Sequence, residues 1–233
     1  TNADAVNGMK VTFTYSTEKD GAYGDMPSFT NAGSYTIYFK AAAANHETAS
    51  GHFEVTINPK TVTADVAVIG GPFTYNQNEI RPDVIVKDGD ITIPADEYTV
   101  VYTDNINAGT AKVSVIDNKD GNYTVSGDCT FEIGKAYSSI TKDSEAVKDL
   151  VYSGSEQILV TEASGNGGTV KYSLDGESWY TELPRGINAG EYNVSYKVFG
   201  DMNHSDSEVK SIEVIIAKAE SVIKADAAAI ENL

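Results

Sequence analysis

Histidines are the side chains in this sequence best suited to acid–base or metal chemistry, and there are only three of them. His46 and His204 each follow an asparagine, and Tyr123 occupies the same place after Asn122. A position that takes either histidine or tyrosine indicates a packed turn and not a metal ligand. His52 stands alone, and no spacing suggests a Ser–His–Asp or Cys–His arrangement. The histidines therefore predict no catalytic residue, no metal site and no cofactor.

An aromatic motif offers the best candidate for binding. The segment SLDGESW, 173–179, is similar to the Asp-box of sialidases, but its glycine and tryptophan each come one place too early. An aromatic side chain packed across a hairpin turn explains the motif without a ligand. The alternative is that Trp179 and Tyr180 form an exposed platform, because a large, rigid and partly apolar ring can stack on a sugar. These two are the predicted binding residues.

Acidic residues gather at predicted loop tips, where they could hold calcium; they are Asp88, Asp90, Asp96, Glu97, Asp104, Asp117 and Asp120. The run 117–122, Asp-Asn-Lys-Asp-Gly-Asn, superficially resembles a calcium loop. Lys119 and Gly121 stand where the third and fifth ligands belong, so the required spacing is not met. A bound ion and a solvated acidic surface both stay open as interpretations. No pair of carboxylates is singled out for glycoside hydrolysis.

One cysteine and three lysines are the remaining residues considered for chemical reactivity. Cys129 is the only cysteine, which excludes an internal disulfide and a cysteine-based zinc site, and we expect it to be a buried small hydrophobe. Lys60, Lys135 and Lys218 stand near predicted strand ends, where Lys–Asn isopeptide bonds are an alternative. No Lys–Asn–acid trio can be nominated from the sequence.

The overall charge limits the classes of partner that we expect the chain to bind. The 233 residues include 34 acidic and 17 basic ones, for a net charge of -17, and only two of the basic residues are arginine. Such a chain repels phosphate backbones and anionic lipid, so we expect neither nucleic-acid binding nor binding to a membrane surface. No apolar run approaches the roughly 18–20 residues of a transmembrane helix, so we expect no membrane insertion. A hydrophobic content of 41% is sufficient for a buried core.

An internal repeat organises the chain. The tripeptide Asn-Ala-Gly occurs at 31–33, 107–109 and 188–190, each time followed by an alternating apolar run. Asn45-His46, Asn122-Tyr123 and Asn203-His204 follow 14 or 15 residues after the first asparagine. Residues 136–150 also align without gaps onto 219–233. These matches predict repeats at 1–60 (type A, lacking its first strand), 61–135 (type B) and 136–218 (type A), with a truncated further repeat at 219–233.

Alternation with period two indicates strands, and Asp-Gly pairs mark hairpins between them. The predicted inward residues include Tyr35, Ile37 and Phe39 in the first repeat, Ala111, Val113 and Val115 in the second, and Tyr192, Val194, Tyr196 and Val198 in the third. We therefore predict an all-β chain of tandem, small Ig-like antiparallel β-sandwiches in an elongated array, with tyrosine-rich cores.

The stretch YSLDGESWYTELPRGINAGEYNVSYKVFGDMNH, 172–204, resembles repeat domains of large secreted surface proteins of gut Firmicutes. The second repeat, with PDVIVKDG from Pro82, is similar to the companion bacterial Ig-like, or MBG-type, repeat of the same proteins. The resemblance covers nearly the whole chain and implies export to the surface of a Gram-positive bacterium. It implies no catalytic residues.

The predicted function is therefore a non-enzymatic stalk or spacer that projects a distal module; the alternative is an adhesin or carbohydrate-binding module. The expected partners are neighbouring repeats of the same chain, with a host glycan or protein under the alternative. We expect a monomer, although the tail 219–233 could add as a strand to the first repeat of another copy.

Overall fold

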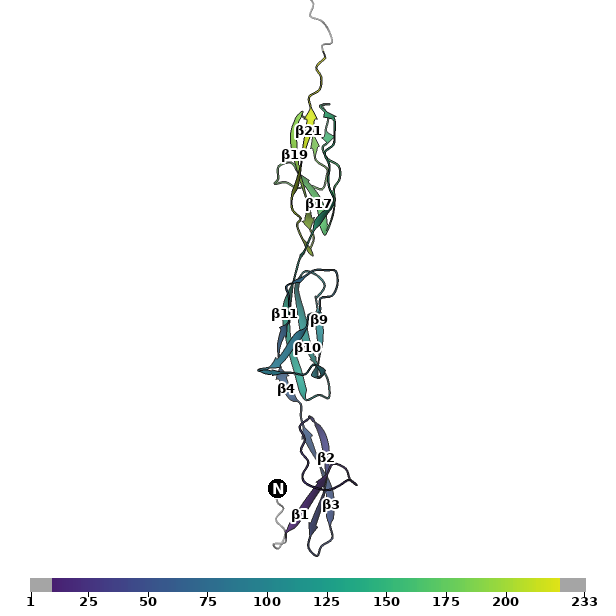
Figure 1. Ribbon diagram of the computed structural model, residues 1–233, viewed down its shortest axis with the longest axis vertical. Helices are drawn as coiled ribbons and strands as arrows, with labels where there is room; N and C mark the ends of the chain where they lie inside the picture. The colour runs from purple at the N-terminus through teal and green to yellow at the C-terminus, as the bar shows by residue number, and fades with distance from the viewer. Residues whose placement is uncertain (1–9, 223–233) are drawn as a thin grey trace, which may run out of the picture. The chain divides into compact units, whose positions relative to one another are not determined.

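A computed structural model describes residues 10–222 and shows a chain built almost entirely of β-strands (Figure 1). The described residues divide into two compact units: unit 1 holds 10–70, 81–103 and 111–131, and unit 2 holds 71–80, 104–110 and 132–222. The predicted all-β fold class is confirmed. The predicted second repeat has residues in both units, so the division into three domains stays a prediction. No helix among residues 10–222 is long and apolar enough to cross a membrane.

Unit 1 begins with a three-stranded antiparallel sheet, β1 (Val11–Ser16), β2 (Gly33–Ala43) and β3 (Ala49–Ile57). Its aromatic side chains contact one another: Phe13 stacks on Tyr15 and meets Phe39, which in turn meets Phe53. Ile37, 2% exposed, is the only fully buried apolar side chain of the described residues 10–57. This sheet therefore has the predicted strand alternation but only one deeply buried apolar residue.

The rest of unit 1 is a sandwich. One layer contains β4 (Lys60–Thr63), β11 (Tyr123–Gly134), β10 (Gly109–Asp117) and β9 (Tyr98–Thr103), and the other contains β5 (Asp65–Val68), β7 (Val84–Asp88) and β8 (Ile91–Thr92). A short 3-10 helix, η2 (Ala95–Glu97), leads into β9. Val62, Val86, Val115 and Val125 form the core with Ala64 and Ile93. Each buried valine stabilises the fold by about 1.5–3 kcal/mol.

Unit 2 contains a four-stranded sheet of β14 (Leu150–Val151), β21 (Lys210–Ala217), β19 (Gly190–Gly200) and β17 (Gly168–Ser173). Three two-stranded sheets accompany it: β12 (Ala136–Tyr137) with β20 (His204–Ser205), β13 (Ser139–Lys142) with β16 (Ser164–Asn166), and β15 (Gln157–Ile158) with β18 (Arg185–Gly186). Leu159 and Val160, both fully buried, pack with Val194, Tyr196 and Val214. This core follows the predicted inward pattern of β19.

Several strand pairs are parallel, although most pairs are antiparallel as predicted. The strand β11 pairs in parallel with β4 inside unit 1 and with β6 (Phe73–Thr74) inside unit 2. Strands β12 and β14 also pair in parallel, with β20 and β21 respectively. Alternation specifies which face of a strand is buried but not the direction of its neighbour, so the sequence could not reveal these pairs.

Candidate functional site

The recurrent asparagines make the first contact between successive repeats, and this contact lies within unit 1. The Asn122 side-chain oxygen accepts a hydrogen bond from the backbone N–H of Ala32 at 2.8 Å. The Asn122 carbonyl accepts a second bond, from the N–H of Lys60, also at 2.8 Å. The Asn-Ala-Gly loop 31–33 and the start of β4 are thus both held by one residue of the next repeat. We call this arrangement an asparagine joint.

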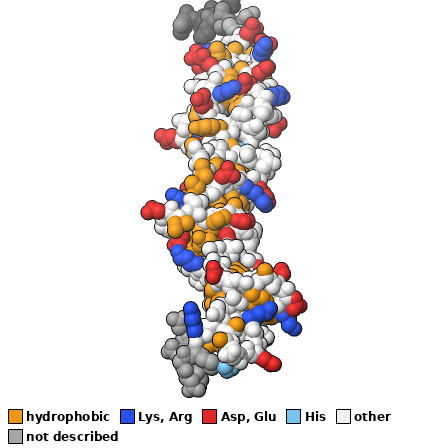
Figure 2. All heavy atoms as spheres, turned by 60° about the horizontal axis from the view of Figure 1, so that its bottom comes forward, with side chains coloured by type: hydrophobic (Ala, Val, Ile, Leu, Met, Phe, Trp, Pro, Cys, Tyr) orange, Lys and Arg blue, Asp and Glu red, His pale blue; other side chains and the backbone are white. Residues whose placement is uncertain are grey.

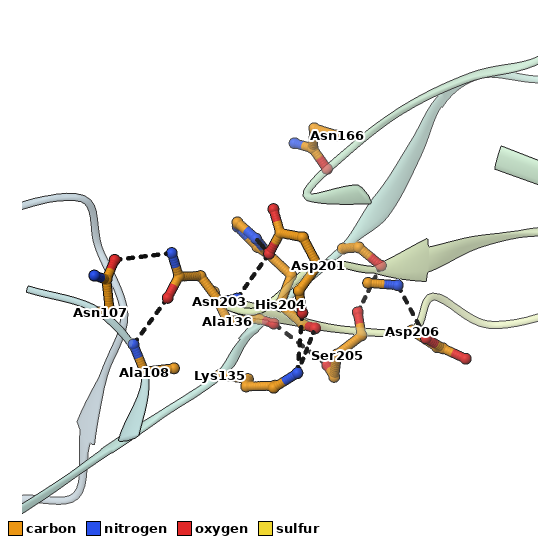
Figure 3. A network of polar contacts seen from close by, with 12 residues as sticks. Asn107, Ala108, Lys135, Ala136, Asn166, Asp201, Asn203, His204, Ser205 and Asp206 are labelled. Carbon is orange, nitrogen blue, oxygen red and sulfur yellow. Dashed lines mark hydrogen bonds and ion pairs between the residues drawn. The ribbon is translucent and has the colours of Figure 1, made fainter. Parts of the chain in front are cut away.

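A second asparagine joint lies within unit 2, at the equivalent positions (Figure 3). The Asn203 side-chain oxygen accepts from the N–H of Ala108 at 2.9 Å, and its amide nitrogen donates to the side-chain oxygen of Asn107 at 3.1 Å. The Asn203 carbonyl accepts from the N–H of Ala136 at 3.0 Å. Asn203 is only 9% exposed, so its amide is largely removed from water. Two equivalent joints show that the pattern belongs to the repeat and not to one place in the chain.

Short-range contacts hold the Asn203 turn in shape. One carboxylate oxygen of Asp201 accepts from the N–H of Asn203 at 2.8 Å and lies 2.7 Å from Nδ1 of His204. The bond from His204, and then the one from Asn203, lower the pKa of Asp201. Lys135 Nζ donates to the carbonyl of Asp201 at 2.9 Å. The His204 ring meets Tyr75 edge-on at 5.2 Å, so this histidine is a packed turn residue, as predicted.

The Asn-Ala-Gly loops share one backbone geometry. The φ angles of Gly33, Gly109 and Gly190 are 151°, 133° and 157°, in the region that side chains with a Cβ rarely adopt. In the first and third loops a tyrosine hydroxyl, two residues beyond the glycine, donates to the asparagine carbonyl at 2.8 Å. The first and third loops are therefore each fixed by a tyrosine of the same repeat, independently of what binds them.

The other two histidines lie beside a loop carbonyl and a tyrosine ring. His46 Nδ1 lies 2.9 Å from the carbonyl of Ala44, beside the exposed Asn45. The ring of His52, on β3, lies 5.8 Å from that of Tyr38.

The predicted aromatic pair is only partly exposed. Trp179 is half-buried, with its ring edge-on to Phe199 at 5.4 Å and Lys197 Nζ 5.4 Å from the ring centre. The side chain of Tyr180 is exposed, at 62%. The expectation of exposure thus holds for Tyr180, while Trp179 packs against Phe199 and Lys197 of β19. Their role as binding residues stays a prediction.

The neighbouring Asp175 closes that hairpin turn. Its carboxylate accepts from the N–H groups of Ser178 and Glu177 at 2.7 and 2.8 Å, and from the Ser173 hydroxyl at 2.8 Å. Because all three bonds favour the charged form, the pKa of Asp175 lies well below its usual range. The motif that resembles an Asp-box therefore contains an aspartate used to stabilise a turn.

Several acidic residues proposed for calcium have other partners. Lys60 pairs with Asp88, the carboxylate of Asp117 accepts from the N–H of Val125 at 2.8 Å, and Glu97, only 7% exposed, accepts from the N–H of Tyr123 at 3.2 Å. Within residues 10–222, no three histidine, cysteine or acidic side chains gather as a metal site would require. On the face shown in Figure 2, carboxylates and apolar side chains lie interspersed.

Cys129 and the lysines named above differ in exposure and in partners. Cys129 is half-buried on β11, and burial, followed by the charge of Asp128, raises its pKa. Lys135 Nζ donates to backbone carbonyls, and Lys218 is exposed. The described contacts of these lysines do not include an asparagine side chain, so the isopeptide alternative gains no support.

Comparison with known proteins identifies no family. No known protein family matches the chain, and no curated protein does. Among solved structures, the chain is similar to SGBP-B of the Bacteroides ovatus mixed-linkage glucan utilization locus, in complex with a mixed-linkage heptasaccharide, at 13% identity and a TM-score of 0.16. The match covers 89% of this chain and 60% of that one. At this level of similarity the comparison assigns no function.

Proposed function

We propose that the chain is a series of non-enzymatic spacer repeats of a bacterial cell-surface protein, which hold a distal functional module away from the cell. The asparagine joints carry this proposal. In both joints, polar residues that recur in every repeat fix one repeat to the next. A residue used to join repeats need not meet a substrate, and such joints keep a spacer from folding back on itself.

Small-angle X-ray scattering on the full chain tests the spacer. We expect an elongated particle about 75–120 Å long, from three repeats of about 25–40 Å each. The double variant Asn122→Ala/Asn203→Ala should keep its strand content by circular dichroism but show a broader distribution of lengths. Asn193→Ala, at an exposed position on β19, is the matched control. A compact wild-type particle, or a double variant identical to the wild type, would contradict the proposal.

The second candidate is a carbohydrate-binding module, and the exposed ring of Tyr180 favours it. Glycan-array binding of the wild type, with loss in Tyr180→Ala and unchanged melting, would support this candidate. The control is Tyr137→Ala, which removes a tyrosine that is 89% exposed elsewhere in unit 2. Equal glycan-array signals from the wild type and the two variants would rule out binding through Tyr180.

A further inference from the structure

The third Asn-Ala-Gly loop, Asn188–Gly190, has a glycine φ angle similar to those of the other two, but no asparagine of the described part of the chain bonds to it. Gly190 has the same backbone geometry as Gly33, and the Tyr192 hydroxyl holds the Asn188 carbonyl just as Tyr35 holds Asn31. Within residues 10–222, no side chain accepts a hydrogen bond from the N–H of Ala189, the counterpart of Ala32 and Ala108. The loop is preformed, and among the residues that the structure describes the Ala189 N–H has no acceptor.

The segment 217–221, at the end of the third repeat, has the same sequence pattern as a segment that makes contacts in the second joint. In the second joint, Lys135 Nζ donates to the carbonyls of Asp201 and His204, and the Ser138 hydroxyl donates to the carbonyl of Ser205 at 2.6 Å. Residues 134–138 are Gly-Lys-Ala-Tyr-Ser, and 217–221 are Ala-Lys-Ala-Glu-Ser. The lysine, alanine and serine therefore recur at matching places, and Lys218 and Ser221 are exposed.

We propose that the loop Asn188–Gly190 and the segment 217–221 form a third receiving site, whose ligand is the asparagine turn of another repeat attached through that segment. The expected ligand has the sequence Asp-x-Asn-His, because 219–233 align with the opening of the third repeat and that repeat bears Asp201, Asn203 and His204. Its asparagine oxygen accepts from Ala189, and its turn carbonyls accept from Lys218.

This inference rests on the proposed function, since it uses the same joint. The test is to append a second copy of residues 151–218 after Leu233, which completes a repeat because 219–233 correspond to 136–150. Amide hydrogen exchange by NMR then compares Ala189 with Ala32 and Ala108. We expect the Ala189 amide to exchange about tenfold more slowly in the extended chain than in the original. Replacing the appended copy's counterpart of Asn203 by alanine should restore fast exchange.

Ala32 and Ala108 are internal controls that separate the two proposals. If both amides are protected while Ala189 exchanges equally fast in all proteins, the third site does not exist. If Ala32 and Ala108 also exchange fast, the joints themselves are absent and the spacer proposal fails. An appended copy that stays unfolded beside a folded parent chain also contradicts the third site, because the segment 217–221 must dock a folded repeat.

Discussion

The Asn203 side chain accepts a hydrogen bond from the backbone N–H of Ala108, a residue 95 positions earlier in the chain. Asn122 makes the same bond to Ala32 over 90 positions. One side-chain amide thus satisfies a half-buried backbone donor of the preceding repeat in each case.

Asn203→Ala should destabilise the chain by about 1–3 kcal/mol, because it leaves the Ala108 N–H without an acceptor in a partly buried place. Urea denaturation measures this loss. The control is again Asn193→Ala, an exposed asparagine on β19, which should change the free energy of unfolding by less than about 0.5 kcal/mol. Equal effects of the two variants would show that the joint adds nothing to stability.

Gly168→Ala should be strongly destabilising. A Cβ at this position would lie 2.0 Å from the carbonyl oxygen of Phe199, on the paired strand β19, so the backbone must move. We expect a loss of about 1–3 kcal/mol or more in urea denaturation. Gly24→Ala, where nothing lies within 4 Å of the new Cβ, should be nearly neutral. Similar midpoints for the two variants would contradict the close strand approach.

Asp175→Ala should lower the free energy of unfolding by an amount that depends on pH. The turn N–H groups lower the pKa of Asp175 in the folded state, so its stabilising effect is complete above the unfolded value of about 3.9 and is lost as the pH falls below it. The difference in urea midpoint from the wild type should be largest near neutral pH and shrink in acid. Glu177→Ala, in the same turn, provides the comparison. A difference that grows in acid would refute the assignment.

Cys129 should react slowly with thiol reagents. Burial raises its pKa, so a smaller fraction is thiolate at a given pH, and the half-buried sulfur is harder to reach. Ellman's reagent at pH 8 should modify the native chain more slowly than glutathione and react quickly in urea. A native rate equal to that of glutathione would mean that the thiol is open to solvent.

The face of each strand could be predicted from the sequence, but the partners of several strands could not. Ala111, Val113 and Val115 on β10, and Val194 and Val198 on β19, are buried as their alternation predicts. Tyr35 and Phe39 on β2 are only half-buried, which alternation does not reveal because burial also depends on what covers the sheet.

The asparagine joints, too, could be predicted only in part from the sequence. Both of their halves recur in the sequence with a fixed spacing, so each was recognisable as a marker of the repeat. Their contact was not, since the asparagine of one repeat bonds to the loop of the repeat before it. The shared recurrence of two short polar motifs is the signal that could have suggested the contact.

Each repeat carries both halves of the joint, a loop of three residues and an asparagine turn. Each joint therefore depends only on the two adjacent repeats that form it. Duplication or loss of a whole repeat by recombination would bring together a loop and a turn of the same types. For the spacer proposed above, we therefore expect that array length can change by whole repeats without compensating changes in the hydrophobic cores.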